Sequence, residues 1–517
     1  MQNYRTPPAE RAPRITLARG FEQAFRWGLP PALTIALLWL TGDGTATPAQ
    51  AFLALLLLQA TWGSWVSWKA KPARERDFPL FTTVAAGYFL TFGFPAFWNS
   101  HALWRDLVSD QATTRAVALA VVGVAALWCG MRLDLCCRLR RAPTLGLKDT
   151  PTSPRYVAAV MLLGLGLRYV PSLAYVFGSA SRQVFMIAAA TLPLVGYAIL
   201  LRRQLMRPVP MHERLLLVLF VVFTFFLGLA SGWVGSGALV LIITGYVLID
   251  TRHRVPKLVI ALALLYVFFL QPAKQQFRTA YWGGASQSGA AERAADWITL
   301  SRQAWTNSLH STTPGAWRDL IYSSMSRGSL LPQTANVMDI TPGIVPYQGA
   351  RMYQYLVVAL IPRVVWPDKP SVNESNRFYQ VTYGMTAERD LDGVSISVGI
   401  LTEAYISYGW TGTIALMLLV GIFLNAVNIV LLGRDSGVLM KAIGIALLPM
   451  FGSADAQMAQ FLGGFLQQIL LVIVVMLPIL RVERRREIPR GAAAGPRGLR
   501  FRAPVMRPGA RPTQSTS

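Results

Sequence analysis

The sequence holds a series of apolar segments that are each about as long as a membrane-spanning helix. Crossing the hydrocarbon core takes about 20 residues at 1.5 Å per residue. About twelve segments have this length and character. They cover approximately residues 26–42, 48–68, 78–98, 113–131, 156–177, 183–201, 213–231, 234–250, 256–272, 410–432, 437–453 and 459–480. Since 53% of residues are hydrophobic and only 14% are charged, the sequence predicts an all-α polytopic membrane protein.

Basic residues mark alternate connections between these segments. Arginines precede the first span, and basic stretches such as "KAKPARER" (69–76), "RLDLCCRLRRAP" (132–143) and "RVERRRE" (481–487) follow even-numbered spans. The other connections carry little positive charge. Positive charge gathers on the cytoplasmic side of membrane proteins, so both termini are predicted to be cytoplasmic. The net charge of +24 therefore reflects membrane topology rather than nucleic-acid binding.

The same pattern divides the chain into four parts. Residues 1–272 hold spans one to nine, and residues 273–409 form one large extracytoplasmic, or periplasmic, loop between the ninth and tenth helices. Residues 410–480 hold the last three spans, and residues 481–517 are predicted to be a basic, disordered cytoplasmic tail. An anionic leaflet attracts each such arginine by about 1 kcal/mol. We expect a multi-pass protein of a bacterial cytoplasmic (inner) membrane.

A loop of this length is too long for a plain connection and is the predicted location of the site. Residues 291–309 have helical spacing of apolar residues, which suits a helix on the membrane surface or one packed on the loop's own core. The apolar run at 354–362 is too short to span, so we expect a buried or re-entrant helix. Pro362 ends that run and places Arg363 at a helix end.

The loop also contributes arginines that suit a phosphate. Guanidinium groups bind phosphate through paired, charge-assisted hydrogen bonds, so Arg327, Arg351 and Arg363 could together hold a pyrophosphate. The alternative is that these arginines pair with the carboxylates of the same loop.

Two segments of the chain resemble a known family. They are "VPYQGARMYQYLVVALIPRVVWPDKP" (345–370) and, about thirty residues later, "SVGILTEAYISYGWTG" (397–412). Their Pro-Arg-x-x-Trp-Pro-x-Lys-Pro turn and Glu-x-Tyr-x-x-x-Gly-x-x-Gly entry to a helix resemble the Wzy-type oligosaccharide repeat-unit polymerases of bacterial surface polysaccharides, including O-antigen polymerases. The resemblance covers about residues 330–425, and the remainder matches only in topology.

This resemblance implies a glycosyltransferase C-like membrane enzyme. Such an enzyme transfers a glycan from an undecaprenyl pyrophosphate carrier to a sugar hydroxyl of an incoming lipid-linked repeat unit. It implies no metal and no cofactor, and its partners would be the lipid-linked oligosaccharides, the lipid bilayer, and possible chain-length regulator and flippase proteins, with no nucleic acid.

The resemblance and the local chemistry together nominate site residues. Arg363 would stabilise the pyrophosphate leaving group, and Glu403 would act as the base for the acceptor hydroxyl. Pairing with an arginine, or a capping interaction, is the alternative for Glu403. The candidate substrate-binding residues are Arg327, Arg351, Lys369, Arg168, Tyr347, Trp366 and Tyr405.

Arg168 is the most conspicuous charge within a predicted span. An arginine at the bilayer centre costs about 2.5 to 3.5 kcal/mol on insertion scales, so Arg168 should reach the external leaflet and the carrier pyrophosphate, or snorkel to the interface.

Two other functions use similar features. A ligase of the O-antigen type would use the same lipid-linked donor with another acceptor. A lipid-linked glycan flippase or transporter would usually carry paired repeats and broken helices, and no repeat is evident here.

Overall fold

The computed structural model describes residues 17–98, 108–169, 179–282, 288–313, 316–317, 320, 324, 328–363, 365–366, 368–391, 396–452 and 455–485. These residues form helices and one small antiparallel sheet of β1 (Thr144–Leu147) and β2 (Leu480–Glu483), in which Thr144 pairs with Glu483. The long helices are α1 (Leu17–Thr41), α2 (Pro48–Ala70), α4 (Asp110–Arg132), α5 (Thr152–Tyr169), α7 (Ser179–Met206), α8 (Met211–Ser231), α9 (Gly235–Arg252), α10 (Lys257–Leu270), α12 (Ala290–Leu309), α14 (Leu331–Ile340), α17 (Gly399–Val427), α18 (Val438–Gly452) and α19 (Met458–Met476). Shorter helices are α3 (Leu80–Tyr88), α11 (Lys274–Tyr281), α15 (Tyr355–Leu360) and α16 (Glu374–Thr382).

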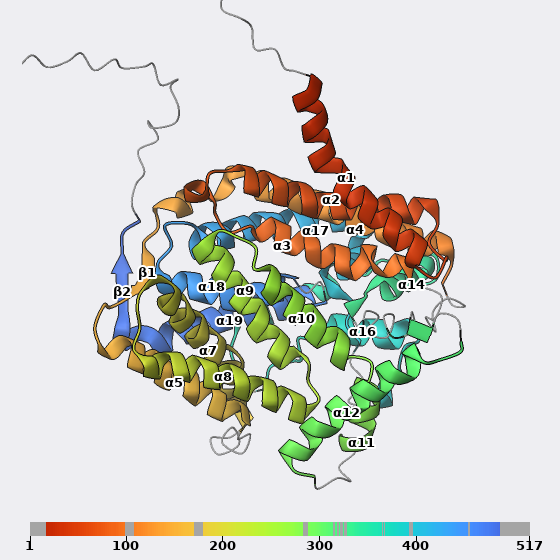
Figure 1. Cartoon of the computed structure of the whole chain (residues 1–517). Helices are drawn as coiled ribbons and strands as arrows, with labels where there is room; N and C mark the ends of the chain where they lie inside the picture. The colour runs from red at the N-terminus through yellow and green to blue at the C-terminus, as the bar shows by residue number, and fades with distance from the viewer. Residues whose placement is uncertain are drawn as a thin grey trace, which may run out of the picture.

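The helices form a bundle with two distinct ends (Figure 1). The sheet of β1 and β2 lies at one end, which we name the strand end, and α14 and α16 lie toward the other. Helices α2, α3, α4 and α17 run along one side of the bundle, α5, α7 and α8 run along the opposite side, and α18 and α19 lie between them. Helix α1 packs on α2 and extends out of the bundle at its beginning.

Eight helices are long and apolar enough to cross a membrane, among the residues that the structure describes. A ninth is added if α10 and α11, which are bent by 57° at their junction, count as one span. Each of the twelve predicted spans coincides with a helix, but the structure supports eight to nine spans by length and composition. The membrane class is confirmed, whereas the number twelve is not.

Helix α18 shows why a predicted span can be short. It has 15 residues, and nearly all of them from Leu439 to Leu448 are buried among neighbouring helices. A helix that is surrounded by protein does not have to match the thickness of the bilayer, so its length is set by packing.

An ion-pair cluster joins three helices near the strand end. Asp250 of α9 forms salt bridges with Arg202 of α7 and with Lys441 of α18, whose Nζ lies 3.2 Å from Asp250 Oδ1. The Asp250 side chain is only 8% exposed. Because each buried charge would be costly alone, the cluster requires all three side chains together.

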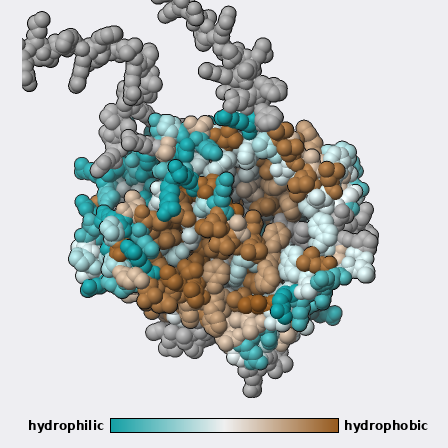
Figure 2. All heavy atoms as spheres, in the orientation of Figure 1, coloured by the Kyte–Doolittle hydropathy of each residue, from teal (hydrophilic) through white to brown (hydrophobic). Residues whose placement is uncertain are grey.

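The surface has an apolar zone between polar ends. Figure 2 shows hydrophobic residues across the middle of the visible face, with hydrophilic residues near the sheet and near α12. Exposed large side chains such as Leu219 and Val222 of α8, and Leu258 and Leu265 of α10, belong to this zone. Exposed apolar area of this extent is typical of a surface that faces lipid.

Two predicted boundaries are refined by the structure. Helix α17 begins at Gly399, and non-helical backbone at Tyr408 and Gly409 divides it, so the predicted span from residue 410 coincides with its second part, while residues 399–407 of the predicted external loop are already helical. The first residues of the predicted disordered tail are ordered. Residues 481–483 belong to β2, and Arg485 donates to the backbone oxygen of Val430 at 3.0 Å. Residues 486–517 of that tail lie outside the described residues. These boundaries depend on contacts with distant residues, which hydropathy does not report.

Candidate functional site

The predicted site segments form a cap on one end of the bundle. We name as the cap residues 328–398, with α14, η6 (Gly349–Met352), α15 and α16. It packs on the first part of α17 through the hydrogen bond from Gln348 N to Ile406 O (3.0 Å) and through the buried hydroxyl pair of Thr334 and Thr402 (2.7 Å). It packs on α19 through α15. The cap is therefore part of the packed core rather than a separate loop.

Glu403 is buried at the junction of the cap with two long helices. Its side chain is 0% exposed. Oε1 accepts a hydrogen bond from Ser375 Oγ of α16 (3.0 Å), and Oε2 accepts one from the backbone N–H of Met458, at the beginning of α19 (2.6 Å). An acidic side chain suits that position, because the first N–H groups of a helix have no partner within the helix and carry partial positive charge. This contact is the capping interaction that was the alternative for Glu403. The role of Glu403 as a base stays a prediction.

A chain of polar side chains continues from Glu403. Gln457 Oε1 accepts from Ser375 N (3.1 Å), and Gln457 Nε2 donates to Asn373 Oδ1 (2.7 Å). Asn376 donates to the same oxygen of Asn373 (2.9 Å). The sequence did not indicate these residues, because isolated Ser, Asn and Gln residues carry no pattern that links 373–376 to 457. A buried network in which every member is bonded holds its groups in one geometry.

Lys369, which the resemblance placed in the motif turn, closes the end of α15. It is 5% exposed, and its Nζ donates to the backbone oxygens of Ile361 (2.7 Å) and Val358 (3.3 Å). Ile361 lies just beyond α15, which ends at Leu360, so its oxygen falls outside the helical ladder, whereas Val358 O also accepts from the Ile361 N–H at 3.2 Å. Burial and the nearby Arg363 guanidinium lower the pKa of Lys369 below its ordinary value.

The remaining described residues of the turn present a different surface. Arg363 is half-buried, and Trp366 is 41% exposed. The backbone N–H groups of Val365 and Trp366 both donate to Pro362 O, at 3.0 and 3.1 Å. In this turn the Lys369 side chain is therefore buried, whereas the Trp366 side chain is exposed at the surface. The apolar run before it is α15, a short helix packed on α19, in which Ala359 is the buried residue. Whether this helix re-enters the membrane stays a prediction.

Arg351 pairs with an acidic residue of the cap. Its guanidinium lies 3.2 Å from Glu374 Oε1 and stacks over the Phe378 ring at 5.0 Å. The pair is partly exposed, so the guanidinium still reaches the surface. The structure thus shows the carboxylate pairing that was the alternative to phosphate binding by this arginine.

Tyr347 and Tyr405 meet beside a break in α17. Their ring centroids lie 6.1 Å apart in an edge-to-face arrangement, and Tyr405 also meets Trp410 at 6.3 Å. Gly409 has φ +64°, and a Cβ at this position would lie 2.7 Å from the Tyr347 hydroxyl. Only glycine adopts this backbone conformation freely, so Gly409 permits both the break in the helix and the approach of Tyr347.

Arg168, near the end of α5, contacts residues at the beginning of α9. Arg168 donates from Nη2 to Ser236 Oγ (3.0 Å) at the beginning of α9, and its guanidinium lies over the Trp233 ring at 4.9 Å. Arg327 lies outside the described residues.

The segment predicted to lie on the membrane surface or on its own core is α12. Trp297 is fully buried and stacks on Phe277 of α11, and its indole N–H donates to Leu270 O (3.2 Å). Helix α12 therefore packs against α11 of the predicted loop, and also against α8 and α10, which lie outside that loop. Its position relative to the membrane surface stays a prediction.

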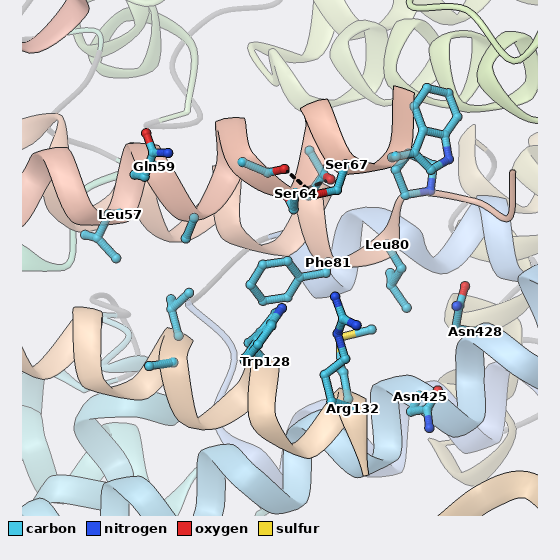
Figure 3. A pocket seen from close by; sticks show the side chains of 18 of the residues that line it. Leu57, Gln59, Ser64, Ser67, Leu80, Phe81, Trp128, Arg132, Asn425 and Asn428 are labelled. Carbon is cyan, nitrogen blue, oxygen red and sulfur yellow. Dashed lines mark hydrogen bonds between the residues drawn. The ribbon is translucent and has the colours of Figure 1, made fainter. Parts of the chain in front are cut away.

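A groove lies between α2 and α4 (Figure 3). None of its lining residues belongs to the cap, and they include Arg132 at the end of α4, from which the chain continues to β1 at the strand end. Its volume is about 720 Å³. Apolar side chains of α2 and α4 line one part of it, and Arg132, Asn425 and Asn428 line the other. The lining also includes Trp128, which stacks under Arg132 with the guanidinium 5.0 Å from the ring centroid.

These features define a class of protein: a polytopic α-helical membrane protein with a packed cap at one end and a lateral groove near the other. The chain belongs to the family described as a domain of unknown function (DUF8712), whose model matches residues 88–430. That range contains every predicted site residue and the whole cap. Comparison with curated proteins and with solved structures finds no match.

Proposed function

We propose that this chain is a polymerase of the Wzy type, which joins lipid-linked oligosaccharide repeat units on the outer face of a bacterial cytoplasmic membrane. In this proposal the chain crosses the membrane twelve times, with a glycosyltransferase C-like arrangement and both termini in the cytoplasm. The cap faces the periplasm, where it meets undecaprenyl pyrophosphate-linked donors and acceptors. A flippase would supply these substrates, and a chain-length regulator would limit the product.

One observation carries the proposal: the two segments of the resemblance form one packed unit. Lys369 of the turn holds the end of α15. Helix α15 lies against α19, where Gln467 Nε2 donates to Ala359 O at 2.8 Å. The backbone N–H of Met458, the first residue of α19, donates to Glu403. A continuous series of contacts therefore connects the turn to the glutamate, as expected if both segments serve one site.

The proposed reaction breaks the bond between the anomeric carbon of the donor and its pyrophosphate oxygen. The pyrophosphate leaves with the electron pair, and the acceptor hydroxyl oxygen forms the new bond to the anomeric carbon. Arg363, with Arg351 and Arg327, would stabilise the charge that grows on the leaving group. Lys369 would position the turn, and Tyr347, Trp366 and Tyr405 would contact sugar rings or the carrier.

The proton of the acceptor hydroxyl goes to a base, for which we keep Glu403. The Glu403 side chain is buried, and its Oε1 already accepts from Ser375 Oγ. In the proposed complex, the acceptor hydroxyl takes the place of Ser375 Oγ as the donor to Oε1. Arg168 would contribute to holding the carrier in the same leaflet.

The test uses a strain that depends on this chain for its surface polysaccharide. The gene is deleted, complemented with wild type, Arg363→Ala or Arg389→Ala, and the polysaccharide is resolved on a gel. Arg389 is the matched control because it is an exposed arginine of the cap that forms an exposed ion pair with its neighbour Asp390. Membrane abundance of each variant is measured by immunoblotting.

We expect deletion to reduce the ladder to a single attached repeat unit. Wild type and Arg389→Ala should restore the ladder, and Arg363→Ala should not. Loss of every attached unit would indicate a ligase or a flippase instead, and an unchanged ladder after deletion would refute the proposal.

A further inference from the structure

The groove between α2 and α4 has the form of a lateral lipid site. Gln50 of α2 donates to Asp110 O (3.4 Å) and to Thr114 Oγ1 (3.2 Å) of α4, so the two helices are joined near their beginnings. The groove is lined by residues further along each helix, from Leu56 to Lys71 and from Val121 to Arg132. Its volume of about 720 Å³ lies within the range of about 300–1,000 Å³ usual for small-molecule sites.

The lining is apolar along most of the groove. Leu56, Leu57, Ala60, Val121 and Val124 supply aliphatic surface. The hydroxyls of Ser64 and Thr82 bond to each other at 2.9 Å, so they present little unsatisfied polarity. In a helix bundle that faces lipid, a trough of this kind accepts an acyl chain, because lipid tails are as apolar as its walls.

The other end of the groove has the chemistry of a membrane interface. Lys71, Arg132 and Asp77 are its ionisable lining residues, which leaves a net positive charge. Trp128 and Trp27 are partly exposed in the same lining, and tryptophan and basic residues gather at the level of lipid head groups. The Asp77 carboxylate already accepts from the backbone N–H of Arg434 (3.3 Å), so the two cations are left facing the groove.

One buried acceptor at this end has no partner. Asn428 Oδ1 is inaccessible to solvent and makes no hydrogen bond within the described part of the chain. Figure 3 shows Asn428, Asn425 and Arg132 on the same side of the groove. A buried acceptor without a donor is costly. Since Asn428 lines the groove, a rotation of its side chain toward the groove would bring this oxygen within reach of a hydroxyl of a bound molecule.

From these observations we propose that the groove binds one anionic phospholipid of the leaflet at the strand end. The phosphate lies between Lys71 and Arg132, a hydroxyl of the head group donates to Asn428, and one acyl chain lies along α2 and α4. Phosphatidylglycerol has this chemistry, whereas phosphatidylcholine has a zwitterionic head group with no net charge and no hydroxyl donor. The inference does not depend on the proposed polymerase activity, since the groove is separate from the cap.

The test is native mass spectrometry of the full-length protein with phosphatidylglycerol or phosphatidylcholine added in detergent. Wild type should retain one phosphatidylglycerol more tightly than phosphatidylcholine. Lys71→Gln combined with Arg132→Gln should weaken this retention at least about tenfold, because two charge-assisted contacts to phosphate are lost. Arg214→Gln is the matched control, since Arg214 is an exposed base at the beginning of α8 that does not line the groove.

A second variant tests the location without removing charge. Ala125 is exposed and lines the groove, so Ala125→Trp should fill it and prevent retention while the protein folds normally. Ala261→Trp, at an exposed position of α10, should leave retention unchanged. Equal retention of the two lipids by wild type, or full retention by Ala125→Trp, would overturn the proposal.

Discussion

Glu403 accepts a hydrogen bond from the backbone N–H of Met458 at 2.6 Å, across 55 residues of sequence. This contact joins the first part of α17 to the beginning of α19 and lies directly under the cap. Ser375 of α16 donates to the other carboxylate oxygen. One side chain therefore orients three helices, and its removal should be felt in both folding and activity.

Substitution of Glu403 separates these two contributions. Glu403→Ala leaves the Ser375 hydroxyl and the Met458 N–H without their acceptor, so we expect it to lower the free energy of unfolding by about 1–3 kcal/mol. Glu403→Gln keeps both contacts, because its oxygen accepts from Met458 and its amide nitrogen donates to the Ser375 hydroxyl. Thermal unfolding in detergent measures both effects.

Activity of the glutamine variant then identifies the role of Glu403. A base requires the carboxylate, so Glu403→Gln should fold like wild type and fail to restore the polysaccharide ladder. A glutamine variant that restores the ladder would show that Glu403 only positions the helices. A glutamine variant as unstable as Glu403→Ala would contradict the hydrogen-bond pattern.

Lys369 should make stability depend on alkaline pH. Its pKa is lowered in the folded protein by burial and by Arg363, from an ordinary value of 10.5. Between the lowered pKa and 10.5, the unfolded chain binds more protons than the folded chain, so the stability of the folded state rises with pH across that interval. Lys369→Met removes this rise.

The measurement compares unfolding temperatures of wild type and Lys369→Met at about pH 8 and about pH 10. The difference between the two proteins should shift in favour of wild type at the higher pH. An unchanged difference would mean that the Lys369 ammonium is not disfavoured by its site. Other groups that titrate in this range are common to both proteins and cancel.

Gly409 should not tolerate a side chain. Gly409→Ala forces a residue with a Cβ to adopt φ +64°, which costs about 1–2 kcal/mol, and places that Cβ against the Tyr347 hydroxyl. We expect a lower unfolding temperature and separation of Tyr347 from Tyr405.

The control is Gly166→Ala in α5, where no heavy atom lies within 4 Å of the added Cβ. Alanine in a helix interior is favoured over glycine by about 0.5–1 kcal/mol, so this variant should be at least as stable as wild type. Equal effects of the two substitutions would refute the close approach at Gly409.

Asp250 should be indispensable to the cluster at the strand end. Asp250→Asn leaves Arg202 and Lys441 buried without their counter-charge, and loss of one partner from a buried pair costs about 3–5 kcal/mol. Asp149→Asn is the matched control, because Asp149 forms an exposed pair with Arg207 and such pairs contribute about 0–1 kcal/mol.

Unfolding in detergent with increasing denaturant compares the two variants. Replacing Arg202, Asp250 and Lys441 together by apolar residues of similar size should recover much of the stability lost in Asp250→Asn, because no unpaired buried charge remains. A small effect of Asp250→Asn would show that water reaches the cluster.

Hydropathy located the helices well, because a membrane helix satisfies its own backbone and needs only a local run of apolar residues. Each predicted span, from α1 to α19, coincides with a helix. The apolar run before Pro362 was also predicted as a short helix, and it is α15. The sequence did not reveal where α17 begins, because the residues around Glu403 become helical core only when α16 and α19 pack on them.

The site shows the same difference between what the sequence predicts and what the tertiary structure determines. The resemblance of two segments to one family nominated Lys369 and Glu403 as residues of the same site, which stays a prediction. Their orientation, with Lys369 on the end of α15 and Glu403 on the beginning of α19, depends on contacts between residues far apart in the chain. The groove between α2 and α4 likewise has no sequence signature, because a groove is the space left where two helices diverge, and packing across the whole bundle sets their angle.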